Sequence, residues 1–329
     1  MKAVSLERRH TCRWQNQLIK QNHTLGIALS IAGYTAWVVG DTLVKLAGKT
    51  LPVVEILAIN YLVSCLSTIV LAASRGGVQQ LSTNRPGFHA WRAIFVMGAT
   101  WGSFAGLMYL SLADFYTVIF TSPLILTALG SLILKEKVDL PMWLAIVFGF
   151  LGVVVAVQFS NFSGVSLSWV GVVVTSVASL SLAVAMLTAR AAGNENNYAL
   201  SFWPSAINFL VSAIAMLVLG KVTMNAEGTI YAALSGVLGA LGLLLTNASL
   251  RVAPVAIVSP YHYIQIVGGI VIGYLIWHHV PTVAMLIGAT MIIGSGVYVL
   301  RAEQKRAASE AAEAGVIPKQ LISVRLEDA

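Results

Sequence analysis

The chain is built from apolar stretches of about 20 residues, and these restrict its fold more than any other feature. A stretch of that length crosses a bilayer as a helix, because a helix satisfies its backbone hydrogen bonds internally. The alternation typical of a membrane β-barrel is missing from these stretches. Because 57% of the residues are apolar and only 10% are charged, an ordinary soluble domain is excluded. We therefore predict an all-α integral membrane protein.

Ten such stretches follow one another, and short polar connections separate them. The predicted architecture is ten transmembrane helices between two tails, 1–24 and 301–329. The stretch before Thr24 has no apolar core, so we expect no signal peptide in it. Neither Cys12 nor Cys65 is accompanied in the sequence by other potential metal ligands, and no structural disulfide is expected. To within a few residues, the predicted helices cover 25–46, 54–74, 93–112, 115–134, 141–159, 169–189, 199–220, 229–250, 254–276 and 280–300.

Lysine and arginine are distributed unevenly between the two sides of this membrane domain. With a cytoplasmic N-terminus, the outer side carries only Lys49 and Lys221, with Lys45 near the outer end of the first helix. The positive-inside rule therefore predicts a multi-pass protein of the cell (inner) membrane with both termini in the cytoplasm. The same bias accounts for the net charge of +7, so no nucleic-acid partner is expected. The cytoplasmic side would carry Lys2, Arg8, Arg9, Arg13, Lys20, Arg75, Arg85, Arg92, Lys135, Lys137, Arg190, Arg251, Arg301, Lys305, Arg306, Lys319 and Arg325.

Two parts of the chain show the same order of features. "SLADFYTVIFTSPLILTALGSLILKEK", from Ser111, and "SLRVAPVAIVSPYHYIQIVGGIVIGYLIWHH", from Ser249, both begin with Ser-Leu and reach Ser-Pro in mid-helix. Each then leads through a short turn with proline into another apolar helix. The unit is five helices, used twice as 25–160 and 165–300. Because five is odd, the second copy enters the membrane from the opposite side, and we predict an inverted repeat.

The ends of both halves resemble a known family. "SPLILTALGSLILKEKVDLPMWLAIVFGFLGVVVAV" in the first half, and "APVAIVSPYHYIQIVGGIVIGYLIW" with "GATMIIGSGVYVLRAE" in the second, are similar to the ten-helix, EamA-like group of the drug/metabolite transporter superfamily. The resemblance covers about residues 25–300 and implies a secondary transporter. Two positions depart from the family's pattern: Asn60 stands where many relatives have arginine, and His278 where an acidic residue usually ends the ninth helix. The resemblance therefore carries over neither a substrate nor a coupling ion.

Each Ser-Pro site predicts a break in its helix. Proline lacks a backbone donor and frees the carbonyl four residues earlier, which is Ile119 for Pro123 and Ala256 for Pro260. Counted along the helices, Pro123 lies nearer the outer face and Pro260 nearer the inner face. Broken helices at matched positions are typical of transport sites. We interpret the two prolines as hinges or gates, with simple helix curvature as the alternative.

Asp41 and Lys45 lie four residues apart inside the first helix, and so on one helical face. An unpaired aspartate in mid-membrane costs about 3 kcal/mol, so its presence needs a reason. Two interpretations stay open. One is a local ion pair in which the lysine extends outward, and the other is a role for Asp41 in binding the substrate or a coupled proton. Trp37, one turn earlier, would lie close to the bilayer centre.

Other polar and aromatic side chains lie within apolar helices. The commonest role of an asparagine in an apolar helix is hydrogen bonding to another helix. Such asparagines are also candidates to bind substrate, and here they are Asn60, Asn208 and Asn247. Trp101 and Tyr109 share the third helix, as core or as cavity wall. We include all five among the candidate site residues.

Small residues at spacings of four predict two close helix contacts. Such a smooth face lets a second helix approach closely, which is packing and not chemistry. The residues are Gly98, Gly102 and Gly106 in the third helix and Ala232, Gly236 and Ala240 in the eighth.

Polar side chains follow Pro260 directly in the ninth helix. At this depth hydrogen-bonding groups are costly unless they face a cavity or one another. One turn separates Tyr261 from Gln265, so in an α-helix both would reach the same space. The sequence therefore predicts a cavity wall made by Tyr261, His262, Tyr263 and Gln265.

Three classes of function are compatible with these features. The repeated break favours a secondary transporter, because alternating access needs two gates. An intramembrane enzyme that uses His262, and a non-transporting assembly or regulatory subunit, are the alternatives. No nucleophile elbow, HExxH motif or phosphate-binding glycine loop is present in the sequence, so we expect neither an enzyme nor a cofactor.

The expected substrate is a small organic molecule. The rings suited to stacking on a planar substrate are Trp37, Trp101, Tyr261 and Tyr263, and the side chains able to satisfy amide or hydroxyl groups are Asn60, Gln265 and His262. These residue types favour import of a riboflavin-like vitamin, with export of amino acids or their derivatives as the alternative. The partners expected are this substrate, the lipid bilayer and a coupled proton, in a monomer or homodimer.

Overall fold

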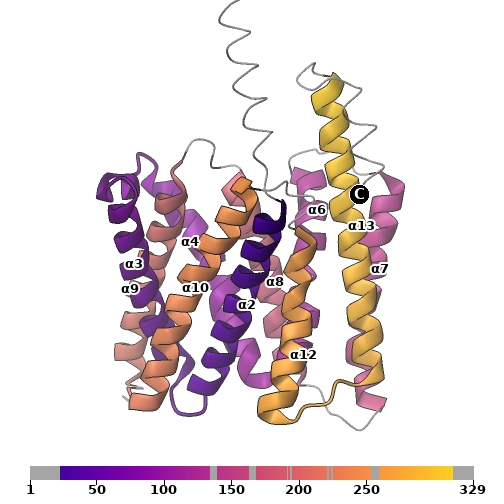
Figure 1. Ribbon diagram of the computed structural model, residues 1–329. Coiled ribbons are helices and arrows are strands. Elements are labelled where there is room, and N and C mark those ends of the chain that lie inside the picture. The colour runs from indigo at the N-terminus through magenta and orange to yellow at the C-terminus, as the bar shows by residue number, and fades with distance from the viewer. Residues whose placement is uncertain are drawn as a thin grey trace, which may run out of the picture.

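The chain folds into a bundle of helices (Figure 1). The computed structural model describes residues 23–133, 139–162, 168–190, 192, 195–220, 222–223, 225–252 and 259–313. Among these, two short 3₁₀ helices, η1 (Val78–Leu81) and η2 (Ser259–Tyr263), lie between the α-helices. The α-helices are α2 (His23–Ala47), α3 (Val53–Ser74), α4 (Pro86–Tyr109), α5 (Leu112–Ile119), α6 (Ser122–Ile133), α7 (Leu140–Phe162), α8 (Trp169–Arg190), α9 (Asn197–Leu219), α10 (Ala226–Val252), α12 (Ile264–Trp277) and α13 (Val283–Glu313).

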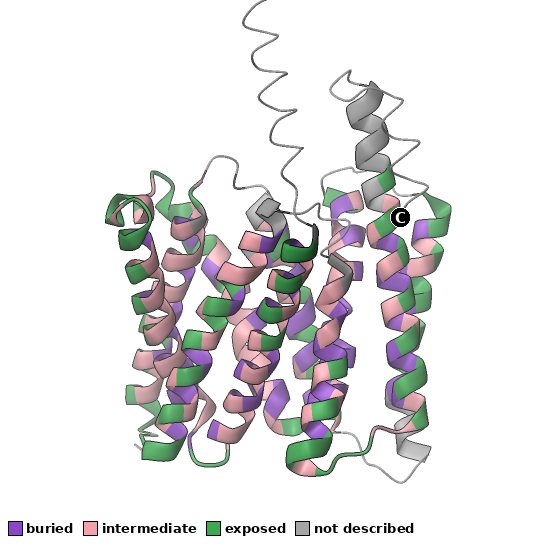
Figure 2. Cartoon of the chain, viewed as in Figure 1, coloured by how far each residue is buried: buried purple, intermediate pink, exposed green. Residues whose placement is uncertain are grey.

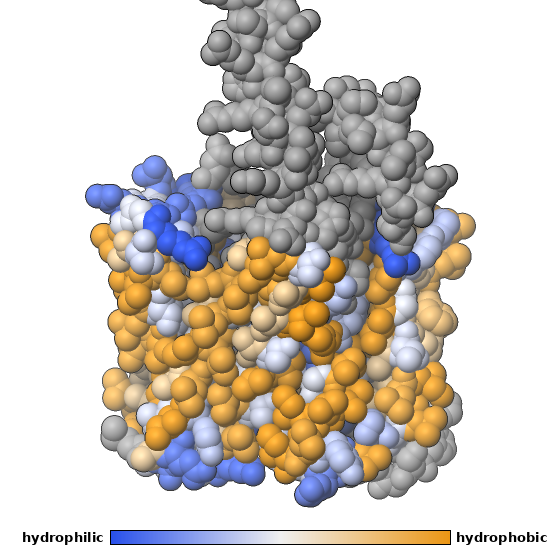
Figure 3. Space-filling model, in the orientation of Figure 1, coloured by the Kyte–Doolittle hydropathy of each residue, from blue (hydrophilic) through white to orange (hydrophobic). Residues whose placement is uncertain are grey.

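The length and polarity of these helices fit a membrane. In the described residues, seven helical spans are long and apolar enough to cross a bilayer, and Leu140–Ala156 and Tyr261–Trp277 are shorter apolar helices. On the face shown in Figure 3, an apolar belt lies between hydrophilic residues at the two ends of the bundle. Many of the residues exposed on the helices are large and apolar (Figure 2). The predicted all-α membrane fold is confirmed.

The third predicted helix was placed wrongly. It was expected over 93–112, but α4 begins at Pro86 and ends at Tyr109. Proline at the first helical position is a favourable start, and the polar residues of the first two turns hid this start from a count of apolar residues. As a result Arg92, assigned from the sequence to a cytoplasmic connection, lies inside a helix of the bundle.

The contacts between helices repeat under exchange of the two halves. This exchange relates α2 to α8, α3 to α9, α4 to α10, α5–α6 to η2–α12, and α7 to α13. The packed pair α2–α10 then becomes α8–α4, which is also packed, while α3–α9 and α7–α13 map onto themselves. These last two pairs lie at opposite edges of the bundle (Figure 1). The arrangement agrees with the predicted inverted repeat.

The two ends of the bundle are named here by their connections. The terminal face is the end at which α2 begins and the α3–α4 and α8–α9 connections lie (Figure 1). The opposite face carries the α2–α3, α9–α10 and α12–α13 connections. After crossing to the terminal face, α13 continues beyond the predicted helix end at residue 300, as far as Glu313.

A second sequence repeat, missed above, marks the middle of α3 and α9. Residues 58–64 read AINYLVS and residues 206–212 read AINFLVS, so Asn60 and Asn208 hold equivalent places. Asn60 donates from Nδ2 to Ser235 Oγ of α10 (2.9 Å). Asn208 donates from Nδ2 to the carbonyls of Pro204 (2.8 Å) and Ala93 (3.4 Å), the latter in α4. Both asparagines thus form the predicted bonds between helices, and to helices that are themselves equivalent.

The glycine face of α4 packs as predicted. A Cβ added at Gly102 would lie 2.8 Å from the Cβ of Ala178 in α8, and one added at Gly106 would lie 2.2 Å from Thr175 Oγ1. In α10, a Cβ at Gly236 would lie 2.9 Å from the Asn60 carbonyl. Both small-residue faces therefore bring helix backbones close together.

The predicted break at Pro123 is present. Helix α5 ends at Ile119 and α6 begins at Ser122. The carbonyl of Ile119, which loses its partner to the proline, accepts a hydrogen bond from Ser179 Oγ of α8 (3.2 Å). At the second Ser-Pro site the chain forms the 3₁₀ turn η2 before α12. Its predicted free carbonyl, Ala256, lies outside the described residues.

Candidate functional site

A cavity of about 390 Å³ lies between α2, α3, α4, α9 and α10. This volume is within the range of small-molecule sites, about 300–1,000 Å³. Its wall reaches from Val44 and Phe104, near the opposite face, to Leu200 and Ser201 in the first turns of α9 at the terminal face. Its lining residues are Trp37, Gly40, Asp41, Val44, Asn60, Tyr61, Ser64, Arg92, Val96, Thr100, Phe104, Leu200, Ser201, Pro204, Ser205, Ser235, Gly239 and Leu243.

Two charged side chains of opposite sign line this central cavity. Asp41 of α2 accepts a hydrogen bond at Oδ2 from the hydroxyl of Tyr116 in α5 (2.6 Å). Arg92 of α4 donates from Nη1 to the Ala185 carbonyl and to Thr188 Oγ1 (2.9 Å), both in α8. Its Nε is buried and has no partner among the described residues. A site of this kind presents one anion and one cation from different helices.

The ion pair expected within α2 is not formed. In the described residues no ion pair joins Asp41 to Lys45, because each side chain has a partner in another helix. Lys45 Nζ donates to the carbonyls of Leu107 and Leu110, both at 2.5 Å. These carbonyls end α4, where the unsatisfied acceptors and the negative end of the helix dipole attract a cation. The spacing of four placed both residues on one face but did not identify these stronger partners.

The aromatic part of the cavity wall is held firmly. The indole edge of Trp37 packs on α10 at Gly242, where an added Cβ would lie 1.7 Å from Trp37 Cδ1. Tyr61, which follows Asn60 in the repeated heptapeptide, lines the cavity as well. The wall therefore combines three aromatic rings (Trp37, Tyr61 and Phe104), one amide and several hydroxyls with the two charges. In the described residues no group of His, Cys, Asp and Glu side chains could hold a metal ion.

Three of the predicted site residues, Trp37, Asp41 and Asn60, meet in the central cavity. The others do not line it in the described part of the chain. Asn208 is fully buried, with 0% of its surface exposed, and Tyr109 is 56% exposed at the end of α4. Trp101 packs against the core. The side chain of Asn247 lies outside the described residues, as does that of Pro260.

The cluster after Pro260 packs behind α2 rather than in the cavity. The ring of His262 stacks on Tyr34 of α2 (centroids 4.5 Å apart) and meets the edge of Phe120 (4.7 Å). Phe120 also packs on Tyr263 (5.4 Å). Tyr263 and Gln265 are buried and Tyr261 is partly exposed, because the 3₁₀ turn η2 does not follow the α-helical spacing that placed Tyr261 and Gln265 on one face.

These ring contacts bring the two helix breaks together. Phe120 belongs to the break between α5 and α6, and His262 to the turn that precedes α12. The sequence placed the breaks at opposite depths, as two separate weak points. In the structure the side chains beside them touch. Tyr34 of α2 stacks on His262, and Tyr116 of α5, whose ring packs near Phe120, donates to Asp41 at the cavity wall.

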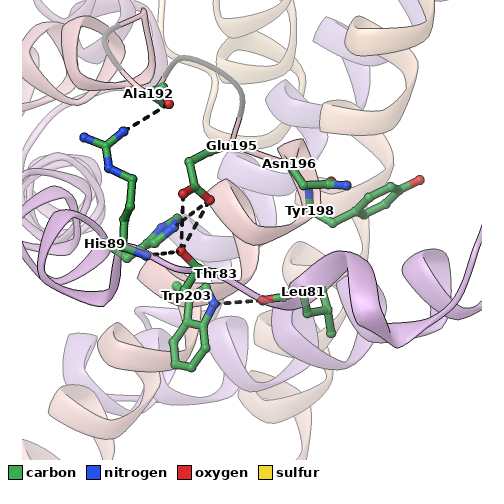
Figure 4. Close-up of polar contacts among 9 residues, drawn as sticks. Leu81, Thr83, His89, Ala192, Glu195, Asn196, Tyr198 and Trp203 are labelled. Atoms are coloured by element: carbon green, nitrogen blue, oxygen red, sulfur yellow. Dashed lines mark hydrogen bonds and ion pairs between the residues drawn. The ribbon is translucent and has the colours of Figure 1, made fainter.

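A polar cluster, here called the terminal latch, joins the two halves at the terminal face (Figure 4). Glu195, just before α9, accepts from Thr83 Oγ1 at both carboxylate oxygens (3.3 and 3.4 Å). His89 Nε2 lies 3.5 Å from Glu195 Oε2. Trp203 Nε1 donates to the Leu81 carbonyl (2.8 Å). These contacts connect the α3–α4 segment of the first half to the α8–α9 segment of the second.

A corresponding latch lies at the opposite face. Glu55, in the first turn of α3, accepts at Oε2 from the backbone N–H of Thr223 (2.9 Å) and from its Oγ1 (3.0 Å). Exchange of the two halves turns this contact into that of Glu195 with Thr83. In each case a carboxylate at the start of the repeat's second helix meets a threonine that follows the same helix of the other repeat. We call the Glu55–Thr223 contact the opposite latch.

Little in the sequence indicated the latches or the place of Arg92. The two partners of each latch lie far apart in the chain, and no local motif marks them. For Arg92 one local feature was available. Pro86 is a favourable first residue for a helix, and a helix that begins there contains Arg92 about two turns from its start.

The EamA-like transporter family matches the chain twice, over residues 24–158 and 169–301. The chain belongs to this family, and it is a transporter of small metabolites rather than an enzyme.

Individual relatives are distant and differ in what they carry. The S-adenosylmethionine uptake transporter of Rickettsia conorii is 23% identical over 87% of this chain and 95% of its own length. The riboflavin transporter of Rhizobium johnstonii is 22% identical over 70% and 76%, and the pseudopaline exporter CntI of Pseudomonas aeruginosa is 25% identical over 82% and 93%. A crystal structure with 16% identity shares the fold, with a TM-score of 0.60 over 84% of this chain and 98% of that one.

Proposed function

We propose that the protein is a secondary transporter for a zwitterionic metabolite, an amino-acid derivative with a planar ring. The observation that carries this proposal is that Asp41 and Arg92 line one cavity together with Trp37. A guanidinium recognises a carboxylate, and a carboxylate recognises an ammonium or sulfonium. An aromatic ring adds stacking or a cation–π contact.

Among the relatives' named substrates, S-adenosylmethionine fits this pattern best. It combines an ammonium, a carboxylate, a sulfonium and a purine ring. Import of a riboflavin-like vitamin is the second candidate, and the rings of Trp37 and Tyr61 with the amide of Asn60 support it. A neutral flavin carries no charge to pair with Asp41 or Arg92. The free-energy cost of burying these two charged side chains in the cavity would therefore not be offset by the substrate.

We further propose that transport is by alternating access with two gates. The terminal latch and the opposite latch would close the two ends in turn. The breaks at Pro123 and Pro260, whose neighbouring side chains touch, would allow the halves to move together. By the bias of its basic residues, the terminal face is the cytoplasmic face. A reporter fused after Arg301 should therefore behave as cytoplasmic, and one near Phe162 as external.

The substrate proposal can be tested with flux into proteoliposomes. We expect Asp41→Asn and Arg92→Gln each to raise the KM for S-adenosylmethionine by roughly 10- to 100-fold, since a hydrogen bond to a charged group contributes about 1.5–3 kcal/mol. Arg75→Gln, at an exposed position of the terminal face, is the control for charge alone. Melting temperatures separate lost binding from lost folding, because Arg92 also bonds to α8. Riboflavin flux that exceeds S-adenosylmethionine flux and is unchanged by both substitutions would overturn the proposal in favour of the second candidate.

A further inference from the structure

A second cavity, of about 380 Å³, opens at the opposite face. It lies where the last turn of α2, the start of α3, the end of α4 and the end of α12 meet. Its lining residues are Lys45, Gly48, Lys49, Leu51, Pro52, Val53, Leu107, Met108 and Trp277. We call it the vestibule.

The vestibule is aligned with the central cavity. Helices α2 and α4 line both spaces. Along α2, Val44 faces the central cavity and Lys45 the vestibule, and along α4 the corresponding residues are Phe104 and Leu107. The residues that line the two spaces are therefore consecutive on α2 and about one helical turn apart on α4. This is the arrangement expected of one pathway that is interrupted by a thin closed partition.

The vestibule concentrates positive charge around one ring. Lys45 Nζ lies 5.7 Å and Lys49 Nζ 6.0 Å from the centre of the Trp277 ring. Among the described residues, no acidic side chain lines the cavity. The nearby carboxylate of Asp114, which interacts electrostatically with Lys45 and His279, belongs to α5 and accepts from Ser111 Oγ (2.5 Å).

Two ammonium groups that share one ring repel each other, and an anion placed between them removes this repulsion. Lys45 uses two of its three donors on the α4 carbonyls and keeps the third for a ligand. Lys49 is exposed and is free to turn toward the same anion.

We propose that the vestibule is a binding site for a carboxylate group, carried either by an organic anion or by an amino-acid derivative. The carboxylate would be held by Lys45 and Lys49 beside Trp277 before or after the molecule crosses the partition. The identity of the carried molecule rests on the function proposed above, whereas the binding of a carboxylate does not. A lipid phosphate shares this chemistry, so the test has to distinguish a free anion from a headgroup.

Lysine reactivity tests the binding without transport. The full chain, purified in detergent, is treated with an amine-acetylating reagent, and acetylation of Lys49 is followed by mass spectrometry with Lys305 as internal reference, which is exposed on α13. We expect succinate at millimolar concentration to slow the acetylation of Lys49 by roughly 3- to 10-fold relative to Lys305. Neutral erythritol and cationic choline should have no such effect. Equal rates with succinate and erythritol would overturn the proposal.

Nanodiscs separate the two sources of the anion. In discs of phosphatidylcholine alone, succinate should still protect Lys49. Protection that requires phosphatidylglycerol and is insensitive to succinate would identify a lipid headgroup site and contradict the proposal.

Flux from each side tests the link to transport. In proteoliposomes of uniform orientation, Lys49→Gln should raise the KM for S-adenosylmethionine offered at the opposite face by about 3- to 10-fold and leave the KM at the terminal face unchanged. Lys305→Gln is the matched control. Equal changes in KM at both faces would contradict a vestibule role. If the unaltered protein carries no S-adenosylmethionine, the proposed substrate fails, and the succinate experiment still decides whether the vestibule binds a carboxylate.

Discussion

The repeated heptapeptides of α3 and α9 occupy equivalent places in two different surroundings. Asn60 lines the central cavity, whereas Asn208 is completely buried and bonds to the carbonyls of Ala93 and Pro204. Six of their seven residues are identical, so local sequence does not account for the difference. The positions of the surrounding helices do.

The two latches also differ between the halves, in the length of their hydrogen bonds. Thr223 donates to Glu55 over 2.9 and 3.0 Å at the opposite face, while Thr83 donates to Glu195 over 3.3 and 3.4 Å at the terminal face. Shorter bonds to a carboxylate are stronger. The tighter latch closes the end at which the central cavity stops, and the looser latch lies at the end toward which it extends.

Under the alternating-access mechanism proposed above, such differences between the two halves are expected of one of two facing states. In the other state we expect the halves to exchange surroundings, with Asn208 on a cavity wall and the terminal latch shortened. The latch and asparagine predictions below apply the same substitution to each member of an equivalent pair, because a truly symmetric structure would respond equally.

The largest expected effect is at Gly102 in the close α4–α8 contact, with Gly40, a less crowded glycine of the α2–α10 contact, as the control. A Cβ at Gly102 would lie 2.8 Å from Ala178 Cβ and 3.1 Å from the Val174 carbonyl, whereas one at Gly40 would lie 3.6 Å from Leu238 Cβ. Gly102→Ala should therefore destabilise the protein by about 1–3 kcal/mol through overpacking, and Gly40→Ala should leave it nearly unchanged. Thermal unfolding in detergent measures both. Equal melting temperatures would mean that α4 and α8 separate at little cost.

An intermediate effect is expected at the latches. Thr223→Val removes a hydroxyl donor from Glu55 and should shift the two facing states by about tenfold, since such a bond contributes roughly 1.4 kcal/mol. Thr83→Val should shift them in the other direction by less, because its bonds are longer. The readout is the labelling of Ser201→Cys, on the cavity wall at the terminal face, by an impermeant maleimide in a background with Cys12 and Cys65 replaced by serine. Thr223→Val should slow this labelling and Thr83→Val should accelerate it. Shifts of the same sign would show that the two contacts are not opposed gates.

Much of this fold could be predicted because its signals are local. Apolar length predicted the helices, the Ser-Pro pair predicted the break at Pro123, and the spacing of glycines predicted that another helix packs closely on α4. The site was harder, because it depends on which helices meet. Asp41 was recognised as needing a partner, but Tyr116 lies 75 residues away, and its hydroxyl is one of many in an apolar helix.

The cluster after Pro260 shows a second limit. Tyr263 and Gln265 were expected to avoid lipid, and both are buried. The prediction that they line the cavity, however, assumed that α-helical spacing continues through the proline turn. The 3₁₀ geometry of η2 changes the direction of each side chain. Whether these residues contact substrate in another facing state stays a prediction.

The smallest effects are expected from the two asparagines themselves, and they distinguish a binding role from a packing role. Asn60→Leu removes an amide from the cavity wall and should raise the KM of the transported molecule a few-fold with little change in melting temperature. Asn208→Leu removes two bonds between and within helices, each contributing about 0.6–1.7 kcal/mol in membrane proteins, and should lower the melting temperature while leaving the KM near its original value. Flux and unfolding measured on both variants check this division. If instead Asn208→Leu changes the KM as much as Asn60→Leu does, Asn208 meets the substrate during the cycle. The two asparagines would then share one binding role in alternating states, which would favour the exchange of surroundings over a fixed site in the first half.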